Sequence, residues 1–431
     1  MSQDQAAAPP VRRFGIRWGE LWGNPDFLKF WGGETVSQFG ANVTTLALPL
    51  TAVLTLHATS QQLGTLQASQ FLPFLLFSLV FGVLMDRRRR RPAMIVANAG
   101  RAILVGLVPL LAVLGALRLE LLYAVVFGVG TLTTLFDVSM FSYVPTLVRD
   151  RRHLVEANGK VAASISAATI AGPGLAGFLV QVLTAPITLV VNSVSYVVSV
   201  VSLLLIRVDE PRPEGSGGER HLLREIGEGF GVVLSNPYLR VTALQGGMFN
   251  FFIQFVTTVF VLRAIREIHL SPGVLGVILA TGAVGGLVGV SVAPALTRRF
   301  PVGRVLTVAM VLGTLPSILL AAAGGPPLLA AAMLVPTFMG FSAGAGVSNV
   351  ILVSLRMAVT PNRLLGRVNG SMRLVLYGAI PLGALTAGEL GATIGLRGAL
   401  WVAAAGFLVS LVPVLLSPIP RLRAMPVLEG E

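Results

Sequence analysis

Apolar segments of membrane-spanning length recur along the whole chain, separated by short stretches rich in charge, glycine or proline. A helix needs about 20 mostly apolar residues to cross the hydrocarbon core of a bilayer. The breaks predict an all-helical membrane protein with twelve spans, at 27–55, 62–85, 93–115, 121–147, 157–183, 187–206, 238–262, 273–296, 304–323, 327–355, 368–390 and 397–416. Because the number is even, both chain ends lie on the same side of the membrane.

Two short patterns occur twice at nearly the same offset. Arg-x-Leu-x-x-x-Asn-Gly stands at 152–159 and again at 363–370, and Leu-Gly opens an apolar run at 63–64 and another at 275–276. These matches indicate an internal duplication, so we predict two pseudo-symmetric six-helix bundles. Many secondary transporters are built from such repeats, with the substrate site at the interface between them. The repeat therefore points to transport.

The predicted domains follow from the spans and from one break in the pattern. The stretch after the sixth span carries Asp-Glu-Pro-Arg-Pro and Gly-Ser-Gly-Gly, a flexible linker composition, and then apolar residues every four positions that suit a helix lying on the membrane surface. We divide the chain into an N-terminal segment (1–26), a first bundle (27–206), a linker with an amphipathic helix (207–237), a second bundle (238–416) and a tail (417–431).

Composition supports an integral membrane protein over a soluble α-rich one, with 54% hydrophobic residues, 12% charged residues and a mean hydropathy of +0.80. The net charge of +13 is distributed asymmetrically. We place Arg118, Arg263, Arg266 and Arg397 on one side of the membrane, Arg101 within it and the other Lys and Arg residues on the opposite side. By the positive-inside rule the richer side, with both termini, is cytoplasmic. A basic surface that binds nucleic acid would not show this unequal distribution of Lys and Arg between the loops on the two sides of a membrane.

Several chemistries are excluded by the residues present. Cysteine is absent, and the four histidines lack the close pairing of a metal site. There is no nucleotide-binding loop of the Gly-x4-Gly-Lys-Ser/Thr type and no sizeable soluble domain. We therefore expect neither an enzyme nor ATP-driven transport, and no cofactor. No removable signal peptide is visible, and residues 14–22 are either an interfacial segment or a flexible tail.

The strongest local motif joins the second and third spans. It carries glycine, leucine, aspartate and a run of arginines, at Gly82, Leu84, Asp86, Arg87, Arg90 and Arg91. This motif resembles the loop signature of the major facilitator superfamily, G-x-L-x-D-R-x-G-R-R, with Arg89 in place of the second glycine. The resemblance implies a conformational latch in which Asp86 and the arginines pair with helix ends or acidic groups in one state only. The alternative is a run of arginines that anchors the loop on the cytoplasmic side.

A second motif lies in the fifth span, where Gly172, Pro173 and Gly177 follow Ala168. It resembles the G-x-x-x-G-P-x-x-G-G pattern of antiporters in the same superfamily, with alanine for glycine at 168 and 176. The resemblance favours export, whereas the alternative is a proline kink in a glycine-rich helix. The opening of the chain, from Asn24 to Trp31, resembles bacterial drug and siderophore exporters of the macrolide-efflux and enterobactin-exporter types, which implies a bacterial cytoplasmic (inner) membrane and a monomer.

Polar residues in the first and seventh spans predict a shared cavity. Glu34, Gln38 and Asn42 are spaced four apart, and positions near 212 residues later are again polar. The predicted cavity residues are Glu34, Gln38, Asn42, Gln245, Asn250, Gln254 and Asn349. A carboxyl group in a low-dielectric cavity favours its protonated form, so Glu34 is a candidate proton carrier. Alternatively, it snorkels or pairs with Lys29 or Arg101.

Two further charged residues lie within predicted spans, where charge is expensive and normally faces a partner or a cavity. Asp137 is a candidate for proton carriage, for a local hydrogen bond or, as the resemblance implies, for the latch with Arg87 or Arg90. Arg101 either binds an anionic group or holds Asp137 or Glu34, and we include it in the predicted latch. We predict a transporter that exports a small, amphipathic or lipophilic organic compound, drug- or siderophore-like, in exchange for protons. The alternative is a facilitator or importer of a metabolite in the same fold.

Overall fold

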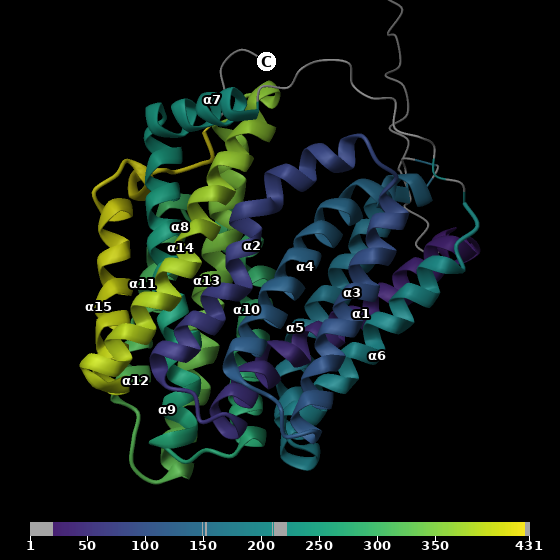
Figure 1. The fold of residues 1–431 in the computed structure, drawn as a ribbon. Helices are drawn as coiled ribbons and strands as arrows, with labels where there is room; N and C mark the ends of the chain where they lie inside the picture. The colour runs from purple at the N-terminus through teal and green to yellow at the C-terminus, as the bar shows by residue number, and fades with distance from the viewer. Residues whose placement is uncertain (1–19, 149, 151–152, 209, 211–221, 427–431) are drawn as a thin grey trace, which may run out of the picture.

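The computed structural model describes residues 20–148, 150, 153–208, 210 and 222–426, and within them it is built from helices without a strand. Most of the N-terminal segment predicted at the membrane interface thus lies outside the described residues, which begin with a short 3-10 helix, η1 (Glu20–Gly23). The long helices run side by side and form two groups (Figure 1). The predicted fold class is confirmed.

The first group contains six long helices. They are α1 (Pro25–Leu50) with its π-helical extension η2 (Thr51–Thr55), α2 (Ser60–Asp86), α3 (Arg90–Val113), α4 (Leu119–Leu147), α5 (Leu154–Leu183) and α6 (Ala185–Leu204). The second group also contains six helical segments, some of them interrupted. They are α8 (Pro237–Phe255) with η4 (Val256–Phe260) and α9 (Val261–Arg266), α10 (Pro272–Arg299), α11 (Val302–Thr314) with α12 (Ser317–Ala322), α13 (Pro327–Ala358), η5 (Asn362–Leu364) with α14 (Leu365–Thr393), and α15 (Gly395–Leu415). A short helix η6 (Ile419–Arg421) follows.

The predicted spans match these segments closely, and the largest difference lies at the start of the eleventh, predicted at 368 and observed at Asn362 when η5 is counted with α14. Eleven helical segments among the described residues are long and apolar enough to cross a membrane. The first segment, α1, is not among these eleven; besides Asp26, Lys29 and Glu34 it carries uncharged polar residues such as Gln38 and Asn42, which lower its mean hydropathy. It is nevertheless packed as the sixth member of its bundle, against α5 and α6.

The duplication extends to the local signals that start the helices. Asn24 and Asn236, 212 residues apart, cap the N-termini of α1 and α8, and each is followed by proline. Thr59 and Ser271, at the same offset, cap α2 and α10 through their side-chain oxygens. Side-chain oxygens at these positions accept hydrogen bonds from N–H groups that have no partner inside the helix. The two halves therefore begin their first two helices in the same way.

Even the backbone of the connecting loops is repeated. His57 and His269, again 212 residues apart, precede α2 and α10, and both adopt a positive φ, of 52° and 57°. A non-glycine residue with positive φ is uncommon, so the same uncommon conformation at equivalent positions is a mark of shared descent. The pseudo-symmetry expected from two short sequence patterns is thus present in loops as well as in helices.

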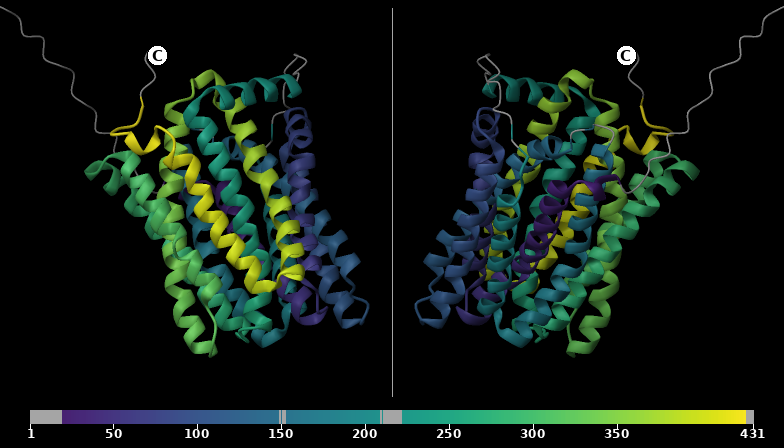
Figure 2. Two further views of the ribbon diagram at one scale, coloured as in Figure 1. Left: turned by 90° about the vertical axis from the view of Figure 1, so that its left-hand side faces the viewer. Right: turned by 90° about the vertical axis from the view of Figure 1, so that its right-hand side faces the viewer.

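The helix α7 (Leu222–Ser235) lies across one end of the molecule, roughly perpendicular to the long helices (Figures 1 and 2). Its Gly229 packs against the backbone of Arg367 at the start of α14, and Glu228 forms an ion pair with Arg367. Val233 is buried, whereas Leu234, predicted on the apolar face, is exposed. We call the end with α7 and the loop 87–91 the basic end, and the opposite end the far end.

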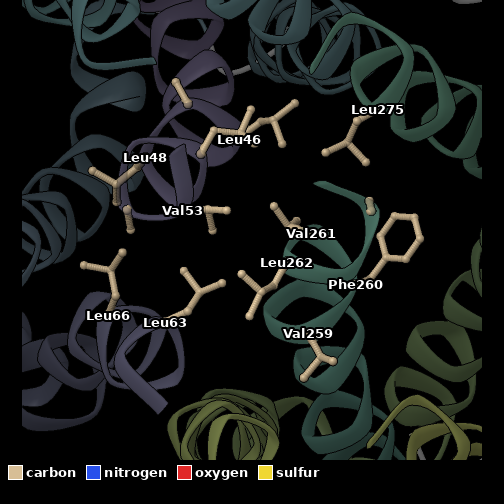
Figure 3. Close-up of a cluster of buried hydrophobic side chains, with 14 of the residues drawn as sticks. Leu46, Leu48, Val53, Leu63, Leu66, Val259, Phe260, Val261, Leu262 and Leu275 are labelled. Carbon is tan, nitrogen blue, oxygen red and sulfur yellow. The ribbon is translucent and has the colours of Figure 1, made fainter. Parts of the chain in front are cut away.

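The apolar core differs between the two ends. At the far end one cluster of buried side chains joins both bundles: Leu46, Leu63 and Leu66 of the first half lie near Val261, Leu262 and Leu275 of the second (Figure 3). Toward the basic end, the first bundle has a cluster around Phe30, Phe136 and Tyr143, and the second has a separate cluster around Leu306, Ile351 and Met372. The bundles therefore pack together at the far end and separate toward the basic end.

Candidate functional site

The far end is closed by two glycine contacts that are related by the duplication. A Cβ atom added to Gly64 of α2 would lie 3.0 Å from the Cα of Gly388 in α14. One added to Gly276 of α10 would lie 3.0 Å from the Cα of Gly177 in α5. Because backbone meets backbone in both places, only glycine fits there without a shift, as in the close helix contacts of membrane proteins. Gly177, from the predicted antiporter motif, thus packs one half against the other.

Polar contacts surround this closure. Gln61 donates a hydrogen bond of 2.8 Å from its amide to Glu389, and Arg266 donates one of 2.9 Å to the carbonyl of Ala58. The N–H of Gly273 donates to the side-chain oxygen of Gln181 at 3.2 Å. All three bonds join the first half to the second. They lie at the same end as the glycine contacts, so the far end is sealed by both apolar packing and hydrogen bonds.

Two cavities follow the interface between the bundles. The larger has a volume of about 610 Å³ and is lined by α5 of the first half together with α8, α10, α11 and α13 of the second. It reaches Arg356 in the last turn of α13, toward the basic end. The smaller, of about 300 Å³, lies nearer the far end and is lined by α1, α2 and α5 on one side and by α8, η4 and α13 on the other. Thr169, Ile253, Phe341 and Ser342 line both, so the two cavities adjoin.

Four of the predicted cavity residues line these spaces. Gln245, Asn250 and Asn349 line the larger cavity, and Asn42 lines the smaller one. Glu34, Gln38 and Gln254 are not among the lining residues. Gln254 accepts a hydrogen bond from Thr257, which does line the smaller cavity. The first and seventh spans thus contribute to one cavity, although the ionisable residue of the first span lies deeper in its bundle.

Glu34 is buried inside the first bundle, with its side chain 3% exposed. One carboxylate oxygen accepts a hydrogen bond of 2.6 Å from Gln38, and the other has no hydrogen-bond partner. Glu34 lies within electrostatic range of Arg101 on α3 and Asp137 on α4. Three residues predicted from separate spans therefore form one charged cluster, and its three charges sum to −1 when both carboxyl groups are ionised.

Arg101 is fixed at the centre of this cluster. Its guanidinium lies between the rings of Phe136 and Tyr196, 4.4 Å from each ring centroid, and it donates to the side-chain oxygen of Asn98. Asn98 in turn donates to Ser199 on α6 at 2.7 Å. Stacking on two aromatic faces stabilises a buried cation without neutralising it. The charge of Arg101 therefore remains available to Glu34 and Asp137.

Asp137 connects the cluster to the second half. It lies within electrostatic range of both Arg101 and Arg373, and Arg373 belongs to α14. Arg373 is placed over the rings of Phe74 and Tyr377, which themselves contact across the α2–α14 interface with centroids 4.7 Å apart. A carboxyl group of one bundle thus lies within electrostatic range of a guanidinium of the other, without an ion pair between them. Sequence analysis missed Arg373, because its position depends on how the two halves are placed.

The loop signature lies at the basic end. The carboxylate of Glu210, from the segment after α6, accepts backbone N–H bonds from Arg90 (2.6 Å) and Arg91 (3.0 Å) at the start of α3. The side chain of Arg91 donates to the carbonyls of Leu203 and Leu204 in α6. A carboxylate at a helix N-terminus is favourable because it satisfies free N–H groups and complements the helix dipole. The loop is thus held within its own bundle, through a glutamate that the sequence analysis assigned only to a linker.

The two glycine positions of the signature, Arg89 and Gly82, differ in their surroundings. Arg89, which replaces the second glycine, has φ −64° and ψ 134°, an extended conformation open to any residue. The substitution therefore does not strain the loop. A Cβ added to Gly82 would meet no atom within 4 Å. Among the described residues, space is therefore open beside Gly82 on α2, one turn before Asp86 and Arg87.

The proline motif of α5 lies at the contact between helices. A Cβ added to Gly172 would collide with Asn42 of α1, and the carbonyl of Pro173 lies against Gly276 of α10. Pro173 also lines the smaller cavity. The helix continues through the proline from Leu154 to Leu183. These residues place α5 between the cavity, α1 and the second bundle.

Two duplicated six-helix bundles, sealed together at one end around an internal cavity, define the class as a membrane transporter. The sequence model of the Major Facilitator Superfamily matches residues 30–384, and the chain belongs to this superfamily.

Curated relatives include exporters. The chain is 26% identical over 418 residues to the "Multidrug efflux pump Tap" of Mycolicibacterium fortuitum, covering 90% of this chain and 93% of that protein. It is 21% identical over 263 residues to "Macrolide efflux protein A" of Streptococcus pyogenes, covering 61% of this chain and 64% of that protein.

Solved structures share the fold. A crystal structure of the nucleoside transporter NupG has a TM-score of 0.74 at 11% identity, over 90% of this chain and 98% of that one. A bacterial homologue of the iron transporter ferroportin in an inward-facing state has a TM-score of 0.72 at 16% identity, again over 90% and 98%. At these identities the likeness concerns the fold.

Proposed function

We propose that the protein exports a small, amphipathic or lipophilic organic compound, drug- or siderophore-like, in exchange for protons. It works as a monomer whose bundles, 27–206 and 238–416, rock about the cavity between them. Efflux relatives that match most of the chain support export. The lining of both cavities is largely apolar with scattered amides and hydroxyls, which suits such ligands.

The direction of transport depends on which end faces the cytoplasm. The basic end carries the arginine-rich loops 87–91, 298–304 and 421–423, so the positive-inside rule supports a cytoplasmic location for it in a bacterial inner membrane. The larger cavity extends to Arg356 at that end, whereas the far end is sealed. In this orientation the structure corresponds to an inward-open state, in which an exporter loads its substrate.

The observation that carries the proton-coupling proposal is the environment of Glu34. A carboxyl group buried in the first bundle, with one unpartnered oxygen, is bonded to Gln38 and lies within electrostatic range of Arg101 and Asp137. Binding or loss of one proton changes the net charge of this cluster by one unit. The region has a low dielectric constant, so the change in Coulomb energy with neighbouring charges is large. Asp137 lies within electrostatic range of Arg373 of the other bundle, so the same change alters the attraction between the halves. Protonation of Glu34 or Asp137 is thereby linked to the rocking motion.

The latch is the second part of the proposal. Gly82, Asp86, Arg87, Arg90 and Arg91 form a surface that engages the second bundle when the basic end closes, with Arg101 and Asp137 as its inner part. In the open state Glu210 holds Arg90 and Arg91 within the first bundle. The Gly172-Pro173-Gly177 segment maintains the α5–α10 contact during exchange and supports an antiporter.

The test uses everted membrane vesicles with an imposed inside-acid gradient. We expect them to accumulate amphipathic drug-like compounds above the level reached by vesicles without the protein, and to release them when the gradient is collapsed. Glu34→Gln should keep binding and lose at least about tenfold of the gradient-driven uptake, since each 1.4 kcal/mol of lost coupling is a factor of ten. Glu120→Gln, an exposed carboxyl in the first turn of α4, is the matched control and should behave as wild type. Uptake that ignores the gradient, or full coupling in Glu34→Gln, would refute the proposal.

A further inference from the structure

One arginine of the long helices lines the larger cavity and has neither an ion pair among the described residues nor an aromatic ring over its guanidinium. Arg263 donates to the carbonyls of Leu320, Ala321 and Ala323 and pairs with Glu267. Arg101 is stacked between two rings and bound to Asn98, as described above. The Nε of Arg101 is buried without a hydrogen-bond partner, but both faces of its guanidinium are covered by aromatic rings and one terminal nitrogen is bonded. A charge in a membrane helix usually has partners of this kind.

Arg356 is the exception. It lines the larger cavity, its Nε is buried without a hydrogen-bond partner, and its closest bond is a long one of 3.4 Å to the side-chain oxygen of Asn369. Among the described residues no carboxylate lies within 4.0 Å of its guanidinium. A guanidinium carries five N–H donors in a planar fork that fits a carboxylate, sulfonate or phosphate.

A second residue in the lining of the same cavity has an unpartnered polar group. Ser348, 6% exposed, lines the cavity, and its hydroxyl has no hydrogen-bond partner. Many serine and threonine side chains in these helices donate to the carbonyl one turn earlier, as Ser354 and Thr337 do, although the buried hydroxyl of Thr258 is also unpartnered. A buried hydroxyl without such a bond is unfavourable unless a ligand supplies the partner. Gln245 and Asn349, which also line the cavity, add amide donors nearby.

The remainder of the cavity is largely apolar, with neutral amides and hydroxyls, and the described residues that line it include no acidic side chain. Phe249 and Phe341, with stacked rings 5.7 Å apart, line the wall. Arg356 is the one ionisable residue among the described residues that line either cavity. Ser348 and Arg356 are eight positions apart on α13, so their groups are separated by about 12 Å along the helix axis. A ligand that contacts both Ser348 and Arg356 therefore has the length of a small drug with an acidic group at one end.

We propose that Arg356 binds the acidic group of an amphipathic organic anion, whose apolar body lies against Phe249 and Phe341 and whose acceptor atoms reach Ser348. The preferred substrates are therefore amphipathic organic acids rather than lipophilic cations. This inference rests on the proposed export function, and it narrows the substrate class. A lipophilic cation would bring its charge toward an uncompensated guanidinium, which lowers its affinity.

The test compares two probes that share one fluorophore and differ in charge: dansylglycine, an anion, and dansyl-ethylenediamine, a cation. Both are titrated against the full chain in lipid nanodiscs. We expect dansylglycine to bind at least tenfold more tightly. Arg356→Gln should lower its affinity about tenfold and remove the preference, a loss of about 1.4 kcal/mol. Arg356→Lys should keep part of it, and Ser348→Ala should lower it two- to fivefold. Arg304→Gln, which removes an exposed charge from the same end, is the matched control.

If the wild-type protein binds dansylglycine no more tightly than dansyl-ethylenediamine, the proposal is overturned. It is also overturned if the Arg356→Gln variant folds and still binds the anion more tightly than the cation. Vesicle uptake of the two probes separates this result from the proposed function. Gradient-driven uptake of the cation alone, in excess of that in vesicles without the protein, overturns the substrate class and leaves proton-coupled export intact. Arg356-dependent binding of the anion, without gradient-driven uptake of any compound, supports the binding site and overturns the export mechanism.

Discussion

The far end and the basic end of this molecule are built from the same duplicated helices, yet they are packed in opposite ways. At the far end the bundles share one apolar core, and glycines 64, 177, 276 and 388 bring backbones into contact. At the basic end each bundle has its own core, and a Cβ added to Gly82, Gly159 or Gly370 would meet nothing within 4 Å. Glycine inside a helix costs about 1 kcal/mol relative to alanine. We infer that Gly82 is retained for a contact made in another state, when the basic end closes.

The largest expected effect comes from breaking the closure of the far end. Gly276→Ala places a methyl group against the carbonyl of Pro173 and the Cα of Gly177, neither of which can rotate away. We expect the free energy of unfolding to fall by about 1–3 kcal/mol, as for other overpacked sites, and transport to fall with it. Thermal unfolding in nanodiscs and vesicle uptake measure both.

Gly159→Ala is the matched control for that variant, because it makes the same change in a helix at the basic end, where space is open. Its stability should stay within about 0.5 kcal/mol of wild type. Equal stability of the two variants would contradict the idea that the far end is sealed by backbone contact.

A change in the loop signature should affect transport more than stability. Asp86→Asn removes a charge from the surface that we assign to the closed basic end, so we expect vesicle uptake to fall about tenfold, equivalent to about 1.4 kcal/mol, while Tm stays constant. Arg88→Gln, in the same loop but at a variable position of the signature, should transport as wild type. Unchanged uptake by Asp86→Asn at normal expression would refute the latch.

The smallest effect is expected from the polar rim of the far end. Gln61→Ala removes one exposed hydrogen bond to Glu389, and such bonds contribute at most about 1 kcal/mol. Uptake should remain within about twofold of wild type, and Tm should change little. A loss as large as that of Gly276→Ala would show that hydrogen bonds, rather than glycine packing, hold the two halves together there.

Much of the fold could be predicted because the bilayer imposes a simple rule on helix length. The spans were located from apolar segments alone, and the duplication from two short patterns. The paired caps Asn24 and Asn236, and the paired loop residues His57 and His269, were also visible in the sequence at the same offset of 212 and would have strengthened that conclusion.

The site was less predictable, since helical spacing alone does not fix which neighbour a side chain faces. Glu34 and Asn42 were assigned to one stripe, but positions four apart drift by about 40° per step at 3.6 residues per turn. Asn42 consequently lines the smaller cavity, while Glu34 turns toward Arg101. Arg373 and Glu210 acquire their roles from segments distant in sequence, and Arg356 is distinguished by the partners it lacks, which only the packed structure reveals.

The central claim is that the basic end and the far end open and close in turn. Distances between the two bundles, measured at both ends, test this claim most directly. Because the chain has no cysteine, spin labels can be attached at Arg88→Cys and Arg363→Cys on the basic end, and at Thr59→Cys and Ala392→Cys on the far end, without removing native thiols. Pulsed electron spin resonance in nanodiscs should show the first pair approaching and the second pair separating when substrate is added with a change of pH. Distances that stay fixed, or that lengthen at both ends together, would contradict the account.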